Sequence, residues 1–293
     1  MPLIPYAPTP VIQLNSALLE AHRVRLLVKR EDMNHPVISG NKWWKLKYNL
    51  AEARKRESHT LLTFGGSYSN HLLATAEAAA ILGLKSIGIV RGEPHSPLNS
   101  MLAYAQSRGM KLHHLTREAY REKTQPWLIE QLREQLGDFF LIPEGGTNAL
   151  AVHGTREFGE ELVREISFDY VCLPVGTGGT MAGIVQALRK DQRAIGISVL
   201  KNGNFLREEV SRWLSLESNW SIETRFDFGG FAKTTPELLD FIERERREHN
   251  LPLDPVYTAK ALYGVYAMIR DNEIRPSSTV LVIHTGGLWG ITQ

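Results

Sequence analysis

A lysine that closely follows a glycine turn is the first feature of the sequence that could do chemistry. In residues 29–46, KREDMNHPVISGNKWWKL, Gly40 lets the backbone turn tightly and Lys42 stands at the expected start of a helix. Shielding from water and nearby backbone dipoles can lower the pKa of such a lysine, and its neutral amine can then form a Schiff base. Lys45 and Lys47 leave a second interpretation open, because closely spaced lysines commonly form the solvated face of a helix.

A polar, glycine-rich loop follows the apolar run at residues 61–64. In residues 64–71, FGGSYSNH, two glycines offer free backbone N–H groups. Three side chains add hydroxyl and amide donors: Ser67, Ser69 and Asn70. Such a loop at a helix N-terminus suits a carboxylate or another anion. The spacing also approaches the G-x-S-x-G turn of hydrolases around Ser67, but Ser69 stands where that turn needs glycine, so we favour an anion site.

A second glycine-rich loop lies within residues 173–183, LPVGTGGTMAG, between a predicted strand and a predicted helix. Its members are Gly176, Thr177, Gly178, Gly179 and Thr180. Backbone amides and two hydroxyls at a helix N-terminus form a phosphate cradle. The loop lacks the Gly-Lys-Ser/Thr ending of nucleotide triphosphate sites, and Met181 replaces the third glycine of the dinucleotide fingerprint. We therefore favour a phosphate monoester, and with a reactive lysine this indicates pyridoxal phosphate (PLP), which has one phosphate and one aldehyde.

Two further side chains stand near the C-terminal end of the sequence. Thr285 follows the predicted strand at residues 279–284 in the segment HTGG, and Tyr257 follows a proline turn in DPVYT. A threonine at the end of a buried strand faces the edge where ligands bind in open α/β sheets. A tyrosine beside a turn is usually a packing residue, so the local sequence alone assigns Tyr257 no function.

The elements that must position these residues alternate along the chain. Strands are expected at residues 25–29, 61–64, 86–90, 111–115, 139–142, 169–174, 196–200 and 279–284. Helical patterns cover residues 68–82, 117–136 and 147–166, among others. This alternation predicts an α/β fold with mostly parallel sheets covered on both faces. The glycine-rich loops should then meet in one shared cleft, fed by both halves of the chain.

Composition excludes several classes of function. The chain has 293 residues, enough for one large or two modest domains, and a formal net charge of only +2 with cations and anions interspersed. This balance predicts no binding of nucleic acid or of a membrane surface, and no metal site is expected. Cys172 is the single cysteine, so no intrachain disulfide is possible. Without a secretory signal pattern or a long apolar run, the sequence predicts a cytoplasmic protein.

Taken together, the motifs resemble those of the 1-aminocyclopropane-1-carboxylate (ACC) deaminases and D-cysteine desulfhydrases. These are PLP enzymes of fold type II, the tryptophan-synthase-β-like class. The resemblance runs over nearly the whole chain and depends on an ordered set of segments: KRED, SGNKWWKL, GGSYSNH, IPEGGTNAL, VGTGGTMAG, DPVYTAKA and HTGG. One such segment would be weak evidence, whereas the ordered set is specific.

The resemblance implies a role for each candidate residue. Lys42 would hold PLP covalently, Asn70 would hydrogen-bond its 3′-oxygen and Thr285 would meet its pyridine nitrogen. Ser69 would bind the substrate carboxylate or help to move the α-proton, and Tyr257 would act as an acid–base group. The phosphate would be held by the second glycine-rich loop: Gly176, Thr177, Gly178, Gly179 and Thr180.

The resemblance also implies two open, three-layer αβα domains with the cofactor between them. The large, PLP-binding domain would comprise residues 1–44 plus 154–293, and the small domain would be an insertion of residues 45–153. A homodimer is the form expected from the family.

The implied reaction is an elimination on a small amino-acid substrate. Thr285 is neutral and cannot keep the pyridine nitrogen protonated, which favours prompt β-elimination, with D-cysteine giving pyruvate, ammonia and sulfide. ACC deaminases use two tyrosines, and Phe231 and Val282 stand where relatives have tyrosine, which disfavours cyclopropane opening. ACC deaminase activity, giving 2-oxobutyrate and ammonia, and a PLP-binding protein of low turnover remain the alternatives. We expect Trp43 and Trp44 to be packing residues.

Overall fold

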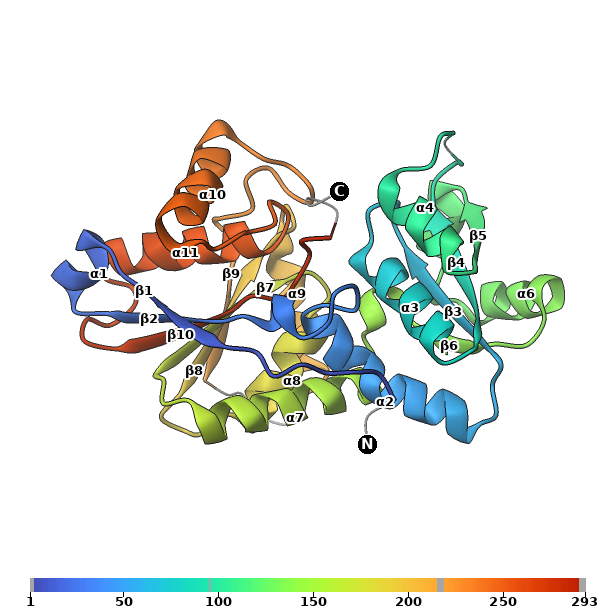
Figure 1. Cartoon of the computed structure of the whole chain (residues 1–293), viewed down its shortest axis with the longest axis horizontal. Coiled ribbons are helices and arrows are strands. Elements are labelled where there is room, and N and C mark those ends of the chain that lie inside the picture. Colours follow the sequence, from blue (N-terminus) through green and yellow to red (C-terminus); the bar gives the residue numbers. More distant parts are fainter. Residues whose placement is uncertain (1–2, 95, 215–218, 290–293) are drawn as a thin grey trace.

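The larger of two β-sheets has six strands and contains the first and the last strand of the described chain. A computed structural model describes residues 3–94, 96–214 and 219–289 (Figure 1). The strand order is β1-β2-β10-β7-β8-β9, and all neighbours are parallel except β1 and β2. Their bounds are Val11–Leu14 (β1), Arg25–Lys29 (β2), Thr279–Ile283 (β10), Tyr170–Val175 (β7), Arg193–Ser198 (β8) and Trp220–Glu223 (β9).

The smaller sheet has four strands, all parallel, in the order β5-β4-β3-β6. Their bounds are Met110–Leu115 (β5), Lys85–Arg91 (β4), Thr60–Gly65 (β3) and Phe140–Ile142 (β6). The two sheets form separate lobes that lie side by side (Figure 1). The C-terminal ends of β3 and β4 lie together at one edge, because Gly65 pairs with Val90 in parallel register.

Helices cover both faces of each sheet. The side chains of β10 alternate, so that Leu281 and Ile283 pack into one core cluster and Val280 and Val282 into another. The helices on the first face are α2 (Asn41–Lys55), α7 (Ala149–Glu165), α8 (Gly179–Ala187) and α9 (Leu206–Ser211). Those on the second are α1 (Ala17–His22), α10 (Pro236–His249) and α11 (Thr258–Arg270). The small sheet packs against α3 (Asn70–Ile81), α4 (Ser100–Ser107), α5 (Arg117–Arg121) and α6 (Pro126–Leu136).

The structure confirms the predicted α/β class with two three-layer units and mostly parallel strands. It adds β1 and β9, two strands of four residues that the pattern did not predict. The helix expected over residues 117–136 is two helices, because Pro126 occupies the first turn of α6 and starts a new helix. The strand expected at 196–200 begins earlier, at Arg193.

The division of the chain at residues 44/45 and 153/154 remains a prediction. Both positions fall inside helices, α2 and α7, which pack against each other. Most of the proposed insertion, residues 60–142, builds the four-stranded sheet and its helices. A boundary within a continuous helix would make α2 the mechanical link between the two lobes.

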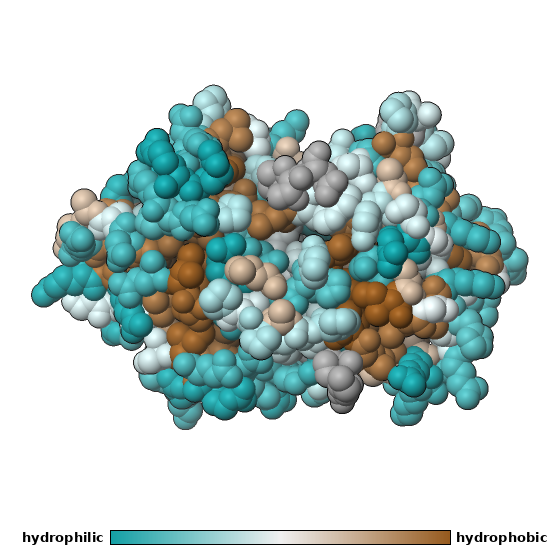
Figure 2. All heavy atoms as spheres, viewed as in Figure 1, coloured by the Kyte–Doolittle hydropathy of each residue, from teal (hydrophilic) through white to brown (hydrophobic). Residues whose placement is uncertain are grey.

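The surface of the molecule is mixed in character. On the face shown in Figure 2, hydrophilic residues cover the outer ends of both lobes, and apolar residues surface in separate areas to either side of the middle. Within the described residues, the longest apolar helices fall short of what crossing a bilayer requires.

Candidate active site

A cavity of about 830 Å³ lies between the two lobes, at the carboxyl ends of their strands. Loops that follow β3, β4 and β6 line it from the small sheet, and loops that follow β7 and β10 line it from the large sheet. The start of α2 and the side chains of Phe231 and Tyr257 complete the wall. The cavity is the shared cleft that the glycine-rich loops predict.

Gly40 fixes the start of α2 against the end of β10. Its φ of +68° lies in the left-handed region, and a Cβ at this position would stand 1.9 Å from the carbonyl oxygen of Thr285. The next N–H, of Asn41, donates to that same oxygen over 3.3 Å. Only glycine permits this approach, and the contact holds Lys42 at the bottom of the cavity.

Lys42 has the properties that its position in the sequence predicts. Its side chain is half-buried, and its Nζ donates to Asn41 Oδ1 over 3.2 Å. Burial of the amine lowers its pKa to about 8, and the buried carboxylate of Asp254 offsets part of that effect. A substantial fraction of the amine is therefore neutral at slightly alkaline pH, which is the form that reacts with an aldehyde.

Lys45 is also a site residue, and its interpretation as part of a solvated helix face was wrong. It is 2% exposed and lines the cavity. Its Nζ donates to Gly145 O at 2.8 Å, Thr147 Oγ1 at 3.0 Å and Thr177 Oγ1 at 3.3 Å. Burial, and then the charge of Lys42, hold its pKa well below the usual range. Lys47, by contrast, is half-buried and pairs with Glu157 at 2.6 Å.

The spacing of the two cavity lysines is a signal that sequence reasoning missed. Positions three apart lie on one face of a helix, so Lys42 and Lys45 had to point the same way. Since Lys42 was assigned to the cavity, Lys45 should have been placed there too.

The second glycine-rich loop forms a concave N-terminus for α8. The loop reverses at Gly178, whose φ is +79°, and α8 begins at Gly179 without a side-chain cap. Asn41 Nδ2 donates to Thr180 Oγ1 at 2.9 Å, and the hydroxyls of Thr177 and Thr147 lie 2.7 Å apart. The first N–H groups of α8 therefore point toward the cavity together with the amine of Lys45.

This loop suits a phosphate monoester. Among the ion pairs of the described residues none includes Lys45, so the loop contains a buried amine whose partners are all neutral oxygens. A dianionic phosphate would favour the charged form of this amine and act as its counter-charge. The cavity lining includes Gly176, Thr177, Gly178 and Thr180, whereas Gly179 faces Thr147, whose Cγ2 would stand 2.8 Å from a Cβ there. The chemistry of these donors fits the phosphate of PLP.

The first glycine-rich loop contributes Ser69 and Asn70 at the N-terminus of α3. Ser69 caps the helix, and its Oγ accepts from the N–H of Leu72 at 3.3 Å, which leaves its hydroxyl proton free to donate. Asn70 is the first residue of the helix, and both side chains line the cavity. The arrangement offers backbone and hydroxyl donors to an anion, as the sequence predicts.

Tyr257 is held over the second glycine-rich loop by the buried carboxylate of Asp254. That carboxylate accepts hydrogen bonds from the N–H groups of the next residues, at 3.0 Å for Val256 and 2.8 Å for Tyr257. A Cβ on Gly176 would stand 3.3 Å from the tyrosine ring. Burial, and then the charge of Asp254, raise the pKa of the phenol well above its usual value, so the group is protonated at neutral pH. Asp254 is a positioning residue that the sequence reasoning did not single out.

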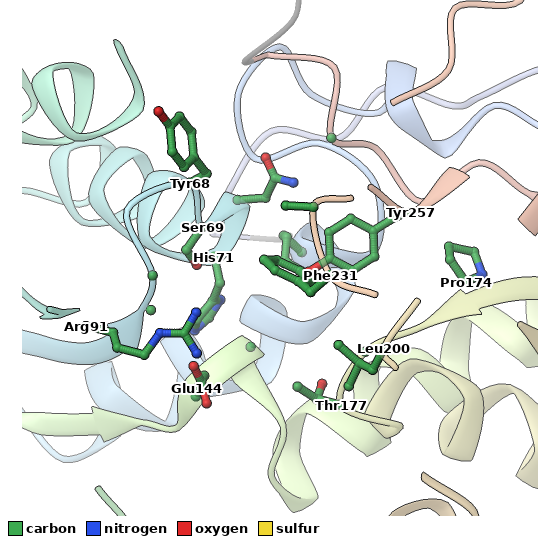
Figure 3. Close-up of a pocket in the computed structure, with 18 of the residues that line it drawn as sticks. Tyr68, Ser69, His71, Arg91, Glu144, Pro174, Thr177, Leu200, Phe231 and Tyr257 are labelled. Atoms are coloured by element: carbon green, nitrogen blue, oxygen red, sulfur yellow. The ribbon is translucent and has the colours of Figure 1, made fainter. Parts of the chain in front are cut away.

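Of the two positions where the family resemblance implies a tyrosine, only one lies at the cavity. Phe231 is 41% exposed, lines the cavity and packs edge-on against Tyr257, with ring centroids 5.8 Å apart (Figure 3). Val282 is 3% exposed and points into the core between the large sheet and α11, outside the cavity lining. The missing hydroxyl at Val282 therefore has no direct bearing on the site, and that part of the argument against ACC was wrong.

The remaining predicted residue, Thr285, also lines the cavity and is 8% exposed. His71, which the sequence did not single out, is buried beside Gly146, and burial followed by the charges of Lys42 and Lys45 keeps its pKa low. The two tryptophans pack as expected. Trp44 stacks on Phe158 with centroids 5.0 Å apart, and Trp43 donates to the carbonyl oxygen of Pro5 at 2.8 Å.

Comparison with known proteins matches this geometry to one family. The family model described as pyridoxal-phosphate-dependent enzyme matches residues 3–286. A Thermotoga maritima protein provisionally named 1-aminocyclopropane-1-carboxylate deaminase is 34% identical over 303 residues, covering 97% of this chain and 95% of the relative. The mitochondrial bifunctional D-cysteine desulfhydrase/1-aminocyclopropane-1-carboxylate deaminase of Arabidopsis thaliana is 31% identical over 314 residues, covering 98% and 78%.

A solved structure agrees with the sequence relatives. The crystal structure of an ACC deaminase homologue superimposes with a TM-score of 0.84 at 27% identity, covering 97% of this chain and 90% of the other. The site geometry and the sequence comparisons lead to one conclusion about Lys42 and the glycine-rich loop beside Lys45. The chain belongs to the pyridoxal-phosphate-dependent enzymes, in the ACC deaminase and D-cysteine desulfhydrase branch of fold type II.

Proposed function

We propose that the protein catalyses β-elimination from D-cysteine or a related β-substituted D-amino acid. With D-cysteine and one water, the products are pyruvate, ammonia and hydrogen sulfide. The observation that carries the proposal is the juxtaposition of the Lys42 amine, the Ser69 hydroxyl and the protonated Tyr257 phenol in one cavity, with Phe231 in place of a second tyrosine. The name of the Arabidopsis relative supports the same substrate.

The roles of the cofactor-binding residues follow from their surroundings. Bound PLP supplies an electron sink for the substrate's α-carbon. Lys42 holds the cofactor covalently, and Lys45 with Thr177, Thr180 and the first N–H groups of α8 neutralises its phosphate. We assign the 3′-oxygen to Asn70 and the pyridine nitrogen to Thr285, which both line the cavity.

The substrate is oriented and deprotonated by groups of both lobes. The N-terminus of α3 and the Ser69 hydroxyl bind the α-carboxylate. The Nζ of Lys42 would take the α-proton, because its lowered pKa of about 8 lets the free amine act as a base. The phenol of Tyr257 donates a proton to the leaving sulfur atom, since its raised pKa keeps it protonated.

ACC deaminase activity remains the second candidate. The relatives' names include it, and Tyr257 is in place. Phe231 lies against Tyr257 where a second hydroxyl would be needed to open a cyclopropane that has no α-proton. For this reason we rank D-cysteine above ACC. A PLP-binding protein of low turnover is the third reading, and a homodimeric state and a cytoplasmic location stay predictions.

The test is keto-acid release from purified, PLP-loaded protein that is offered D-cysteine, L-cysteine and ACC in parallel. We expect pyruvate and sulfide in equal amounts from D-cysteine. A Lys42→Ala variant should release neither, and Lys47→Ala, on the next turn of the same helix, is the matched control that should keep activity. If 2-oxobutyrate is released from ACC faster than pyruvate is released from D-cysteine, ACC deaminase replaces the desulfhydrase assignment. If none of the three compounds yields a keto acid, a binding role is favoured.

A further inference from the structure

Four basic side chains of the small lobe line the same cavity. They are Arg91, Arg117, Arg121 and Lys123, called the cationic wall below. Arg91 is the last residue of β4 and pairs in parallel register with Leu115, two residues before α5. Because Arg117 and Arg121 are four apart in α5, they lie on one face of that helix, beside the end of β4.

A buried tyrosine at the centre of the wall organises two of its cations. Tyr120 is 2% exposed, and its ring centroid lies 6.0 Å from Arg91 Cζ and 5.2 Å from Lys123 Nζ. Its hydroxyl donates to Glu144 Oε1 at 2.8 Å, and Lys123 Nζ lies 3.3 Å from Glu144 Oε2. Tyr120 and Glu144 therefore hold Lys123 beside them, and Tyr120 also contacts Arg91. Figure 3 shows the side chains of Arg91 and Glu144 close together at the cavity.

Within the cavity lining, the wall carries more positive charge than the carboxylates there offset. Its four cations face two carboxylates in the cavity lining, Glu93 and Glu144, which leaves a formal surplus of 4 − 2 = +2. Glu144 is already engaged by Tyr120 and Lys123. Among the ion pairs of the described residues none involves Arg91, Arg117 or Arg121, so their charges are available to a ligand.

Neither the cofactor phosphate nor the substrate carboxylate accounts for this surplus. The proposed phosphate loop belongs to the large sheet and has its own buried cation, Lys45. The α-carboxylate is assigned to the N-terminus of α3, where Ser69 supplies a further donor. Arg91 lies beside the first glycine-rich loop, since its Nη2 would stand 3.6 Å from a Cβ on Gly66.

We infer that the preferred substrate is an amino acid whose side chain ends in an anionic group, held by the cationic wall. The inference rests on the proposed function and deepens it, because it names which β-substituted amino acids the site selects. Carboxylate and sulfonate side chains share the chemistry that Arg91, Arg117 and Arg121 would bind. D-Cysteine, whose thiol is mostly neutral, is then a poorer substrate than an anionic analogue.

A binding experiment tests the inference without turnover. The PLP-loaded protein is titrated with aspartate against asparagine and with glutamate against glutamine, in both enantiomers, and the absorbance of the bound cofactor is followed. We expect the anionic member of at least one pair to bind roughly tenfold more tightly, as a charged hydrogen bond provides. Raising the salt concentration from about 0.05 to 0.5 M should reduce that preference several-fold.

Variants locate the effect. Arg91→Gln and the double variant Arg117→Gln/Arg121→Gln should remove the preference while changing the affinity for the neutral member by less than about twofold. Arg54→Gln is the matched control, since Arg54 is exposed on α2 and lies outside the cavity lining. If Arg91→Gln weakens neutral and anionic amino acids equally, Arg91 binds the α-carboxylate and the inference is overturned.

A turnover experiment separates this inference from the proposed function. S-Carboxymethylcysteine and its neutral amide, S-carbamoylmethylcysteine, differ in charge but hardly in shape. With one water the first gives pyruvate, ammonia and thioglycolate, and the second gives pyruvate, ammonia and thioglycolamide. Faster turnover of the acid supports the inference. Equal or faster turnover of the amide overturns the inference but leaves the proposed function standing. If no amino acid changes the absorbance and none is turned over, the proposed function itself fails and takes the inference with it.

Discussion

The two walls of the cavity are built on opposite principles. The wall from the large sheet is closed: Lys45 is 2% exposed, Thr285 is 8% exposed, and Gly40 leaves no space for a Cβ. The wall from the small sheet is open, and Arg91, Arg117 and Arg121 are exposed to solvent. Buried groups are held in position by the packing around them, whereas exposed side chains can change at little cost to stability. The difference indicates that the first wall determines the chemistry and the second determines which molecule undergoes it.

The largest expected effect concerns Lys42, which the comparison places in the closed wall. Replacement by alanine removes the covalent link to the cofactor and the base for the α-proton, so keto-acid release should fall roughly 1,000-fold or more. The absorbance of the lysine-linked cofactor should disappear. Thermal unfolding of the PLP-free protein serves as the control and should change by only a few degrees. Activity above one-tenth of the original would break the assignment.

The next effect tests how tightly the closed wall is packed. Gly40 and Gly83 share a φ of +68°, but a Cβ on Gly40 would meet Thr285 O at 1.9 Å, whereas nothing lies within 4 Å of one on Gly83. Gly83→Ala should therefore cost about 1 kcal/mol of unfolding free energy, for the backbone alone. Gly40→Ala should cost about 3 kcal/mol or more and weaken PLP binding. If denaturant titration shows the same loss of unfolding free energy for Gly40→Ala and Gly83→Ala, the approach of α2 to the end of β10 is not tight.

A smaller effect is expected for the substitution of Lys45, with opposite consequences for the PLP-free protein and for PLP binding. Without PLP its buried amine lacks a counter-charge, so Lys45→Met should raise the unfolding temperature of the PLP-free protein or leave it unchanged. The same variant should bind PLP roughly 10- to 100-fold more weakly, because the phosphate loses its buried cation. Unfolding temperatures with and without PLP measure both effects, and an undiminished affinity for PLP would remove Lys45 from the phosphate site.

The smallest effect is a pH dependence confined to the closed wall. Lys42 is protonated below its lowered pKa of about 8 and neutral above it. The rate at which the PLP-free protein captures PLP should therefore rise as the pH increases from 6.5 to about 8 and then level off. Stopped-flow absorbance at matched ionic strength checks this, with the Lys47→Ala variant as the control for the neighbouring lysine. A capture rate that keeps rising above about pH 9 would mean that burial does not lower the pKa of Lys42.

Much of the closed wall could be predicted from the sequence because its chemistry is local. Lys42 follows a glycine turn, and Thr177 stands in a glycine loop between a strand and a helix, so a short segment defines each. Lys45 could have been placed through its spacing of three residues from Lys42. Asp254 could not, since its role depends on burial, which arises only when distant segments pack. Lys45 donates a hydrogen bond to Gly145, which is 100 residues away in the sequence, and Asp254 accepts one from the N–H of Tyr257.

The open wall was missed for a similar reason. Arg91 and Arg117 are separated by 25 residues and line the same cavity because β4 and β5 are parallel neighbours, a register that no motif records. Val282 was wrongly expected at the site. Side chains of β10 alternate between the two faces of the sheet, and Val282 lies on the face that α11 covers. The short strands β1 and β9 have four residues each and too little pattern to predict.

The contact between Gly40 and Thr285 has a consequence for biosynthesis. β2 has two neighbours, β1 and the much later β10, and the position of Lys42 depends on Thr285, two residues after β10. While the ribosome makes residues 60–142, the four-stranded sheet has all its strands and can form on its own. The six-stranded sheet must wait for residues 279–283, so Lys42 becomes reactive only after β10 has been made. A nascent chain stalled before β10 should therefore contain a folded small lobe and be unable to capture PLP.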